Sequence, residues 1–387
     1  MIKTFAPPKL LRSEYDIALL WTILALLAIG VIMVYSASIV SAESDRHTGY
    51  HSSYYFIRQL VYVGAATLAA IIAFQIKVET WQRIAPFLFF AVGLPMLLLV
   101  LIPGLGKEVN GSRRWLSLII FNLQPSEFMK FLVVLYAADY TVRKAAFMHS
   151  LTKGFFPMGL VMILVGYLLL KEPDFGALVV MTAITASILF LGGLNWRLFV
   201  ILMLLLSVAF VFLVVMSPYR FNRLIWFWNP WADPFGKGYQ LTHALIAFGH
   251  GGWFGVGLGA SVEKQLYLPE AHTDFLMAVI AEELGFIGVL CTLALFIFLV
   301  WRSFAIGRRA AALGNHFGAL VAQGVGVWIA VQTIVNVGVN MGMLPTKGLT
   351  LPLLSYGGSG IMSNLLALAV LMRIDYELRV SPRSRLS

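Results

Sequence analysis

The chain has 387 residues, of which 60% are hydrophobic and only 12% are charged, and its mean hydropathy is +0.85. No ordinary soluble fold needs so much apolar surface, so the composition predicts a membrane protein. The net charge of +10 comes without a soluble basic domain that could hold nucleic acid. Membrane orientation and anionic lipid substrates explain that charge better.

Apolar segments of about the length that crosses a hydrocarbon core recur along the whole chain. We expect an all-α polytopic membrane protein of about ten transmembrane helices, forming a single membrane domain over residues 1–387. A large external loop at 218–273 separates spans 7 and 8. The predicted spans are residues 16–38, 55–76, 84–102, 125–142, 157–170, 177–193, 198–217, 274–301, 317–339 and 357–372.

Basic residues predict which side of the membrane each loop faces. With the tails 1–15 and 373–387 in the cytoplasm, more than half of the 28 Lys and Arg residues lie in cytoplasmic segments, mostly short loops. We therefore expect a multi-pass protein of the cytoplasmic (inner) membrane with both termini inside. The 218–273 loop is rich in Trp, Gly and Pro, which is typical of amphipathic segments at the membrane interface.

Gly111-Ser-Arg-Arg-Trp115 precedes the fourth span and places two guanidinium groups on the predicted outer face. Arg113 and Arg114 could bind phosphate oxygens in a bidentate way. Contact with lipid headgroups explains such a pair equally well.

Gln124-Pro-Ser-Glu-Phe-Met-Lys130 brings a charged pair into the fourth span. Glu127 and Lys130 are three residues apart, so they can form an ion pair on one helix face. Lys130 either tethers two spans through that pair or faces a cavity and neutralises a phosphate. Asp174, in the break between spans 5 and 6, could be a metal ligand, a substrate contact or a turn residue.

Asp274 follows His272 and Thr273 at the point where the eighth span begins. Thr273 or Asp274 is predicted to cap that helix, where free N–H groups and the helix dipole stabilise an acid. A carboxylate at the outer membrane face could also act as a general base on a sugar hydroxyl. Glu282 and Glu283 would lie about 12 Å deeper along the helix, and one of them is a candidate anchor for a neighbouring span.

The stretch from Leu344 to Gly360 is irregular and contains three glycines in four positions, beside hydroxyl side chains. Such glycines permit close backbone approach to a ligand and expose N–H donors. Non-helical backbone at membrane depth is tolerated only against protein or a water-filled cavity. The candidate ligand-binding residues in this stretch are Lys347, Ser355, Gly357, Gly358 and Ser359.

Together, and in this order, these segments resemble the SEDS family of polytopic cell-wall proteins (FtsW/RodA). The resemblance extends from about Tyr15 to Arg379 and is carried by Pro269-Glu-Ala-His-Thr-Asp-Phe275, Pro345-Thr-Lys-Gly-Leu-Thr-Leu-Pro352 and Ser355-Tyr-Gly-Gly-Ser359. Within the family, the segments that are similar to the cell-division branch, FtsW, are Asn229-Pro-Trp-Ala-Asp-Pro-Phe-Gly236, Gly238-Tyr-Gln-Leu241 and Ala271.

The resemblance implies a peptidoglycan glycosyltransferase that polymerises lipid II at the outer face of the membrane during septal wall synthesis, with undecaprenyl diphosphate as leaving group. It implies a class B penicillin-binding protein (a transpeptidase) and other division-complex membrane proteins as partners. The family's catalytic Asp corresponds to Asp274 and its buried Lys to Lys130. The further candidate substrate contacts are Glu127, Arg113, Arg114, His272, Thr273, Lys347, Ser355, Gly357, Gly358 and Ser359.

Two other functions remain open from the sequence. Ten spans and buried charges also suit a lipid II flippase, but a flippase predicts polar residues throughout the membrane depth, whereas most acids here lie in the outer half. A scaffold for division proteins would leave Asp274 without a task. No cofactor is predicted with certainty: a divalent cation such as Mg²⁺ could assist the diphosphate, but the sequence offers no decisive ligand set.

Overall fold

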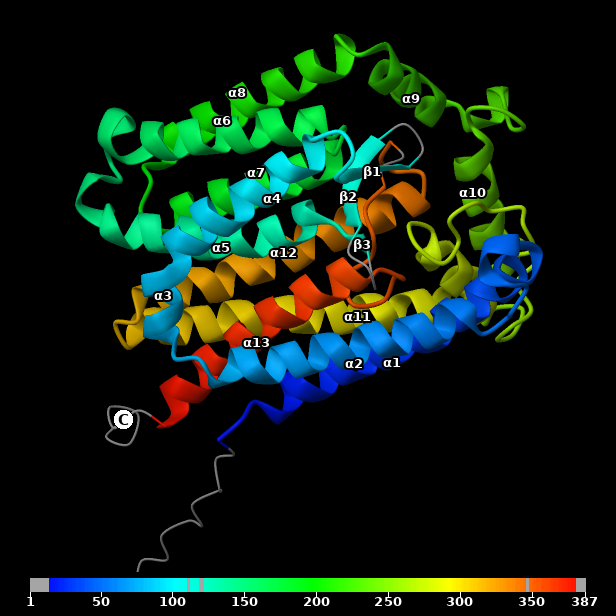
Figure 1. Cartoon of the computed structure of the whole chain (residues 1–387), viewed down its shortest axis with the longest axis horizontal. Helices are drawn as coiled ribbons and strands as arrows, with labels where there is room; N and C mark the ends of the chain where they lie inside the picture. Colours follow the sequence, from blue (N-terminus) through cyan, green and yellow to red (C-terminus); the bar gives the residue numbers. More distant parts are fainter. Residues whose placement is uncertain (1–13, 110–111, 118–121, 346–347, 381–387) are drawn as a thin grey trace, which may run out of the picture.

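The computed structural model describes residues 14–109, 112–117, 122–345 and 348–380, and it is mostly helical (Figure 1). Helices occupy the places of all ten predicted spans, which confirms the all-α membrane fold. They are α1 (Ile17–Ser44), α2 (Tyr54–Gln75), the run of α3 (Val78–Phe87), η2 (Leu88–Gly93) and α4 (Leu94–Leu101), α5 (Pro125–Arg143), α6 (Phe156–Lys171), α7 (Phe175–Leu191), α8 (Trp196–Val215), α11 (Leu276–Ala312), α12 (His316–Asn340) and α13 (Gly358–Val380).

Seven helical segments of the described chain are long and apolar enough to cross a membrane. The other three predicted spans are α5, α7 and α13, so ten crossings stay a prediction. α7 has only 17 residues. α5 buries nearly all of its residues, including charged ones, and packs against α7, α12 and α13. α8 is almost fully exposed and lies at one edge of the bundle, as expected for a helix that faces lipid (Figure 1).

Two helices extend well beyond their predicted ends at residues 301 and 372. Charged residues, which lower the hydropathy there, form ion pairs between the helices: Arg309 of α11 lies 3.7 Å from Asp375 of α13. Residues 373–380 therefore belong to α13 and not to a tail.

The two described ends of the chain lie on the same face of the bundle. Asp16, which caps α1, is ion-paired with Arg302 of α11 and with Arg379 near the end of α13. This arrangement agrees with an even number of crossings. It leaves open which face is cytoplasmic, and the N-in orientation stays a prediction.

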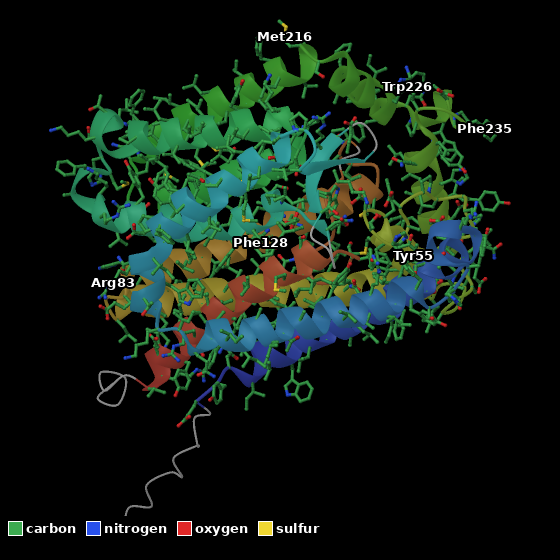
Figure 2. The ribbon with its side chains drawn as sticks, viewed as in Figure 1. Tyr55, Arg83, Phe128, Met216, Trp226 and Phe235 are labelled. Atoms are coloured by element: carbon green, nitrogen blue, oxygen red, sulfur yellow. The ribbon has the colours of Figure 1, made fainter. Side chains whose placement is uncertain are left out.

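The opposite face carries the longer connections. One of them contains a small antiparallel sheet that the helix-only prediction missed, with the strand order β1 (Gly106–Val109), β2 (Ser112–Ser117), β3 (Asn122–Leu123). The sheet joins α4 to α5 and positions Arg113 and Arg114 on β2. Figure 2 marks the two faces, with Tyr55 of α2 near the sheet end and Arg83 of α3 at the other.

The 218–273 loop contains α9 (Pro218–Trp228), the short η5 (Pro230–Ala232) and α10 (Tyr239–Gly251). Several of its aromatic side chains are exposed: Trp228 and Phe235 are 86% and 90% exposed. Figure 2 shows Trp226 and Phe235 at the outer edge of this segment. The exposed rings fit the predicted interfacial location.

α11 is broken by Gly285, whose φ of 67° and ψ of −167° interrupt the helical hydrogen bonding. The segment after α10 closes the gap, because Val256 N–H donates to the carbonyl of Glu282 and Gly257 N–H to that of Glu283. A Cβ added to Gly285 would lie 2.3 Å from the backbone nitrogen of Gly255. Only glycine allows this contact together with a positive φ.

Glu282 and Glu283 both act as anchors, where one was expected. Glu283 accepts from Ser36 of α1 and pairs with Lys264 at 2.6 Å. Glu282 is bonded to the same loop through Ser261 and the backbone N–H of Val262. The two carboxylates therefore join α1, α11 and the 251–264 loop.

We predict that Lys264→Met destabilises the protein by about 3–5 kcal/mol, because it leaves Glu283 charged and unpaired at a fully buried position. Thermal unfolding of the purified protein in detergent measures this effect. The double variant Lys264→Met/Glu283→Leu should recover most of the loss, since both charges are then removed. A single variant as stable as the exposed control Glu79→Gln would contradict the prediction.

Candidate active site

Asp274 lies in a tight turn before α11 and not at its cap. The helix begins at Leu276, and its N-cap position is Phe275, which makes no side-chain cap bond. The prediction that Thr273 or Asp274 caps the helix is wrong, because residues 270–275 form their own turn: Thr273 and Phe275 N–H both donate to the carbonyl of Glu270. Asp274 itself is half-buried.

One point of the structure, which we call the acid–arginine cluster, brings together Asp274, Arg114 and Gly348. A Cβ added to Gly348 would lie 3.2 Å from Oδ2 of Asp274 and 3.9 Å from Nη1 of Arg114. Gly348 itself is exposed. A carboxylate and a guanidinium thus border the same accessible position, which has no side chain of its own.

The backbone that connects α6 and α7 orients Arg114. Its Nε donates to the carbonyl of Glu172 at 3.2 Å, and its Nη2 donates to the carbonyl of Pro173 at 2.5 Å. Arg113 points elsewhere and pairs with Glu108 in an exposed position. Of the two predicted arginines, only Arg114 joins Asp274.

Lys130 is fully buried and forms the predicted ion pair with Glu127, at 2.7 Å. It also donates to Oε1 of Gln332 at 2.8 Å, and its ammonium lies 5.4 Å from the Trp328 ring centroid. Oε2 of Glu127 is buried without a partner, 3.4 Å from where a Cβ of Gly360 would lie. The ion pair lies within α5, and the bond from Lys130 to Gln332 joins α5 to α12; a role of Lys130 towards phosphate stays a prediction.

Two amides that the sequence analysis did not single out hold the Asp274 turn. Asn336 and Asn340 of α12 each donate to the carbonyl of Asp274 at 2.9 Å. The available signal was Gln332, Asn336 and Asn340 at intervals of four residues in an apolar span.

The Ser355–Ser359 segment lies beside Asp274. Ser355 is buried, accepts from the N–H of Leu351 and donates to the carbonyl of Thr273 at 2.5 Å. Ser359 accepts from the N–H of Gln124 at 2.9 Å. Gly358 packs against Tyr62, while a Cβ on Gly357 would meet nothing within 4 Å. Both serines therefore organise backbone, and substrate contacts of this segment stay predictions; Lys347 lies outside the described residues.

His272 packs between aromatic rings, with centroids 4.5 Å from Tyr55 and 5.6 Å from Tyr356. Burial lowers the pKa of His272, although Glu270 opposes the shift. The imidazole is therefore neutral at pH 7 and contributes no fixed positive charge.

The loop before α7 holds two further acids. Asp174 caps α7 by accepting from the N–H of Ala177 and also accepts from Ser126 at 2.7 Å, so it is a turn and cap residue. Glu172 is fully buried, and both of its carboxyl oxygens are without partners. Burial and the neighbouring Asp174 raise the pKa of Glu172 to about 9, against the opposing effect of Arg114.

Among the described residues, no group of three His, Cys, Asp or Glu side chains is placed to hold a metal ion. Assistance of the diphosphate by a divalent cation such as Mg²⁺ stays a prediction.

Known proteins match this chain along nearly its whole length. The FTSW_RODA_SPOVE family, described as "Cell cycle protein", matches residues 17–380. A protein of Aromatoleum aromaticum named "Probable peptidoglycan glycosyltransferase FtsW" is 58% identical over 366 residues, covering 95% of this chain and 89% of that protein. A protein of the same name from Burkholderia thailandensis is 54% identical and covers 97% and 82%, respectively.

Solved structures share the fold. One chain of a structure titled "Structural coordination of polymerization and crosslinking by a peptidoglycan synthase complex" aligns with a TM-score of 0.77 and 27% identity, over 95% of this chain and 99% of that one. The rod shape determining protein RodA of Thermus thermophilus aligns with a TM-score of 0.66 and 26% identity, over 97% of this chain and 100% of that one.

We predict that Gly348→Val lowers catalytic activity at least tenfold without loss of folding. The added side chain would crowd the Asp274 carboxylate, whose Oδ2 lies only 3.2 Å from the new Cβ, and misplacement of a catalytic group by about 1 Å can cost about 10²-fold. Turnover and the unfolding midpoint are measured together. Gly64→Val is the matched control, because a Cβ there meets nothing within 4 Å; equal activity of the two variants would refute the role of Gly348.

We predict that Glu172→Gln stabilises the protein, and that the gain grows with pH. An acid whose pKa is raised in the folded state holds its proton more tightly there, so stability falls as pH rises from 4.5 towards 9. Glutamine stays neutral and removes this loss. Unfolding midpoints at pH 5 and pH 9 check the trend, with the exposed Glu108→Gln as control; a gain that is the same at both pH values would argue against a protonated Glu172.

Proposed function

This chain belongs to the FtsW/RodA/SpoVE family of cell-cycle proteins, and we propose that it is a peptidoglycan glycosyltransferase. In this proposal it polymerises lipid II into glycan strands at the outer face of the cytoplasmic membrane, at the division septum. The observation that carries the proposal is the acid–arginine cluster, where the Asp274 carboxylate and the Arg114 guanidinium border one accessible position.

Asp274 is the general base. Its carboxylate takes the proton of the acceptor sugar's 4-hydroxyl, and the freed oxygen attacks the anomeric carbon of the lipid-linked donor. The bond from that carbon to the diphosphate breaks, and undecaprenyl diphosphate leaves with the electron pair. A carboxylate on a turn at the membrane face suits this step, because it can approach a sugar while the adjacent backbone stays bonded.

Arg114 neutralises the charge that develops on the diphosphate. Two backbone carbonyls hold its guanidinium and leave Nη1 directed towards Gly348. An arginine oriented before substrate arrives needs little reorganisation during the reaction. Lys130 adds a cationic side chain deeper in the bundle, where its ammonium donates to Glu127 and Gln332.

A class B penicillin-binding protein is the proposed partner, since the enzyme must deliver strands to a transpeptidase. Support comes from the similar chain found in a peptidoglycan synthase complex. The exposed aromatic residues of the 218–273 loop, which leads directly to Asp274 in the sequence, would lie close to the site of strand export.

We predict that Asp274→Asn folds normally but polymerises lipid II about 10²- to 10⁴-fold more slowly, the range expected for loss of a general base. The assay follows glycan chains made from labelled lipid II by the purified protein with its transpeptidase partner. The backbone carbonyl of Asp274, which anchors the turn, is unchanged in this variant. Near-normal chain synthesis would exclude Asp274 as the base, and movement of lipid II across the bilayer without polymerisation would favour the flippase.

A further inference from the structure

Three amide side chains stand on one face of α12 and form what we call the amide ladder: Gln332, Asn336 and Asn340. They recur every fourth residue, so they point the same way and cover roughly 12 Å of helix axis. All three are buried, with exposed fractions of 0%, 2% and 0%. Buried amides in an apolar span are retained only where each finds hydrogen-bond partners.

One end of the ladder holds Lys130. Gln332 accepts from the Lys130 ammonium at 2.8 Å and from the indole N–H of Trp328 at 2.7 Å. Its amide nitrogen donates to the carbonyl of Thr350 at 2.8 Å. Gln332 thus fixes the cation of α5 against both α12 and the irregular segment before α13.

The other end holds Asp274. Asn336 and Asn340 share the Asp274 carbonyl, each at 2.9 Å, and Asn336 also donates to the carbonyl of Leu349 at 2.6 Å. Asn340 accepts from the N–H of Ala278 at 3.1 Å, in the first turn of α11. The turn, the start of α11 and the backbone beside Gly348 are therefore tied to one helix face.

We propose that the amide ladder sets the separation between the Lys130 ammonium and the Asp274 carboxylate, and so positions cation and base for glycosyl transfer. This inference rests on the proposed function. The three amides are positioning residues, since each acts through Lys130, Asp274 or the 349–350 backbone. Neutral amides suit the task, because they donate and accept without adding charge beside the base or the cation.

The alternative is that the ladder only stabilises the fold. The two roles differ in what a substitution changes. A structural amide affects unfolding, whereas a positioning amide lowers the rate of the bound complex, because misplacement by about 1 Å can cost about 10²-fold.

The test uses Asn336→Leu, Asn340→Leu and the double variant in the full-length protein with its transpeptidase partner and labelled lipid II. We expect kcat to fall about 10- to 100-fold in each single variant, with KM nearly unchanged. The double variant should lose less than the product of the two single losses, because both amides hold the same carbonyl. Thr333→Val is the matched control: Thr333 is buried in the same helix, and its hydroxyl has no partner.

Hydrogen–deuterium exchange gives a readout that does not depend on catalysis. Residues 270–278 and 348–356 should exchange faster in the asparagine variants and at the wild-type rate in Thr333→Val. If the wild-type protein makes no glycan, the proposed function is wrong. Hydrogen–deuterium exchange then still shows whether the amide ladder holds these two segments.

Unchanged kcat or unchanged exchange in both leucine variants would overturn the proposal. Should a leucine variant not fold, Asn336→Ala and Asn340→Ala take its place. Loss of folding in all four would also overturn it, because the ladder would then be structural.

Discussion

The requirement that every backbone polar group within an apolar bundle be bonded governs this structure. Asp274 lies where the chain changes direction, and a turn there frees N–H and carbonyl groups that hydrocarbon cannot satisfy. The Asp274 turn meets this requirement with side-chain amides of α12 and the hydroxyl of Ser355. Because the two amide donors belong to the buried helix α12, the hydrogen bonds that satisfy the backbone of the turn also fix its position.

The same constraint is met differently at Gly285. There the interrupted helix frees the carbonyls of Glu282 and Glu283, and backbone N–H groups of the 251–257 segment bond them. The two carboxylates bind the same loop again through Ser261 and Lys264. The long loop on the Asp274 face is thus attached to the helix that follows the acid, so that its position and that of the turn depend on each other.

Strong local patterns in the sequence predicted much of this. Ten apolar runs predicted the helices, and the three-residue spacing predicted the Glu127–Lys130 ion pair. Asp274 was identified as an acid at a membrane face, but the cap prediction failed because the 270–275 turn competes with the helix for the same backbone groups. The short sheet was missed because it has few residues and lies between two dominant apolar runs.

Contacts between distant segments could not be predicted from a single sequence. Asn336 and Asn340 bind a residue more than sixty positions away, and no spacing rule reports such a pairing. Arg113 and Arg114 are adjacent residues of the same type, so the sequence does not distinguish them. Arg114 lies near Asp274 because of the direction of strand β2 and because the carbonyls of residues 172–173 hold its guanidinium. Gly348 was not predicted as a site residue, because its contribution is the space that it leaves beside other side chains.

Whether lipid-linked sugars are joined at the face that bears Asp274 can be measured by reconstituting the protein with the proposed transpeptidase partner in sealed vesicles that hold fluorescent lipid II. Glycan chains and transbilayer movement of the lipid are then scored in the same sample. We expect long glycan chains, made from lipid II on the Asp274 side, without an increase in transbilayer movement. Lipid II that crosses the bilayer while no chains form would instead identify the protein as a flippase.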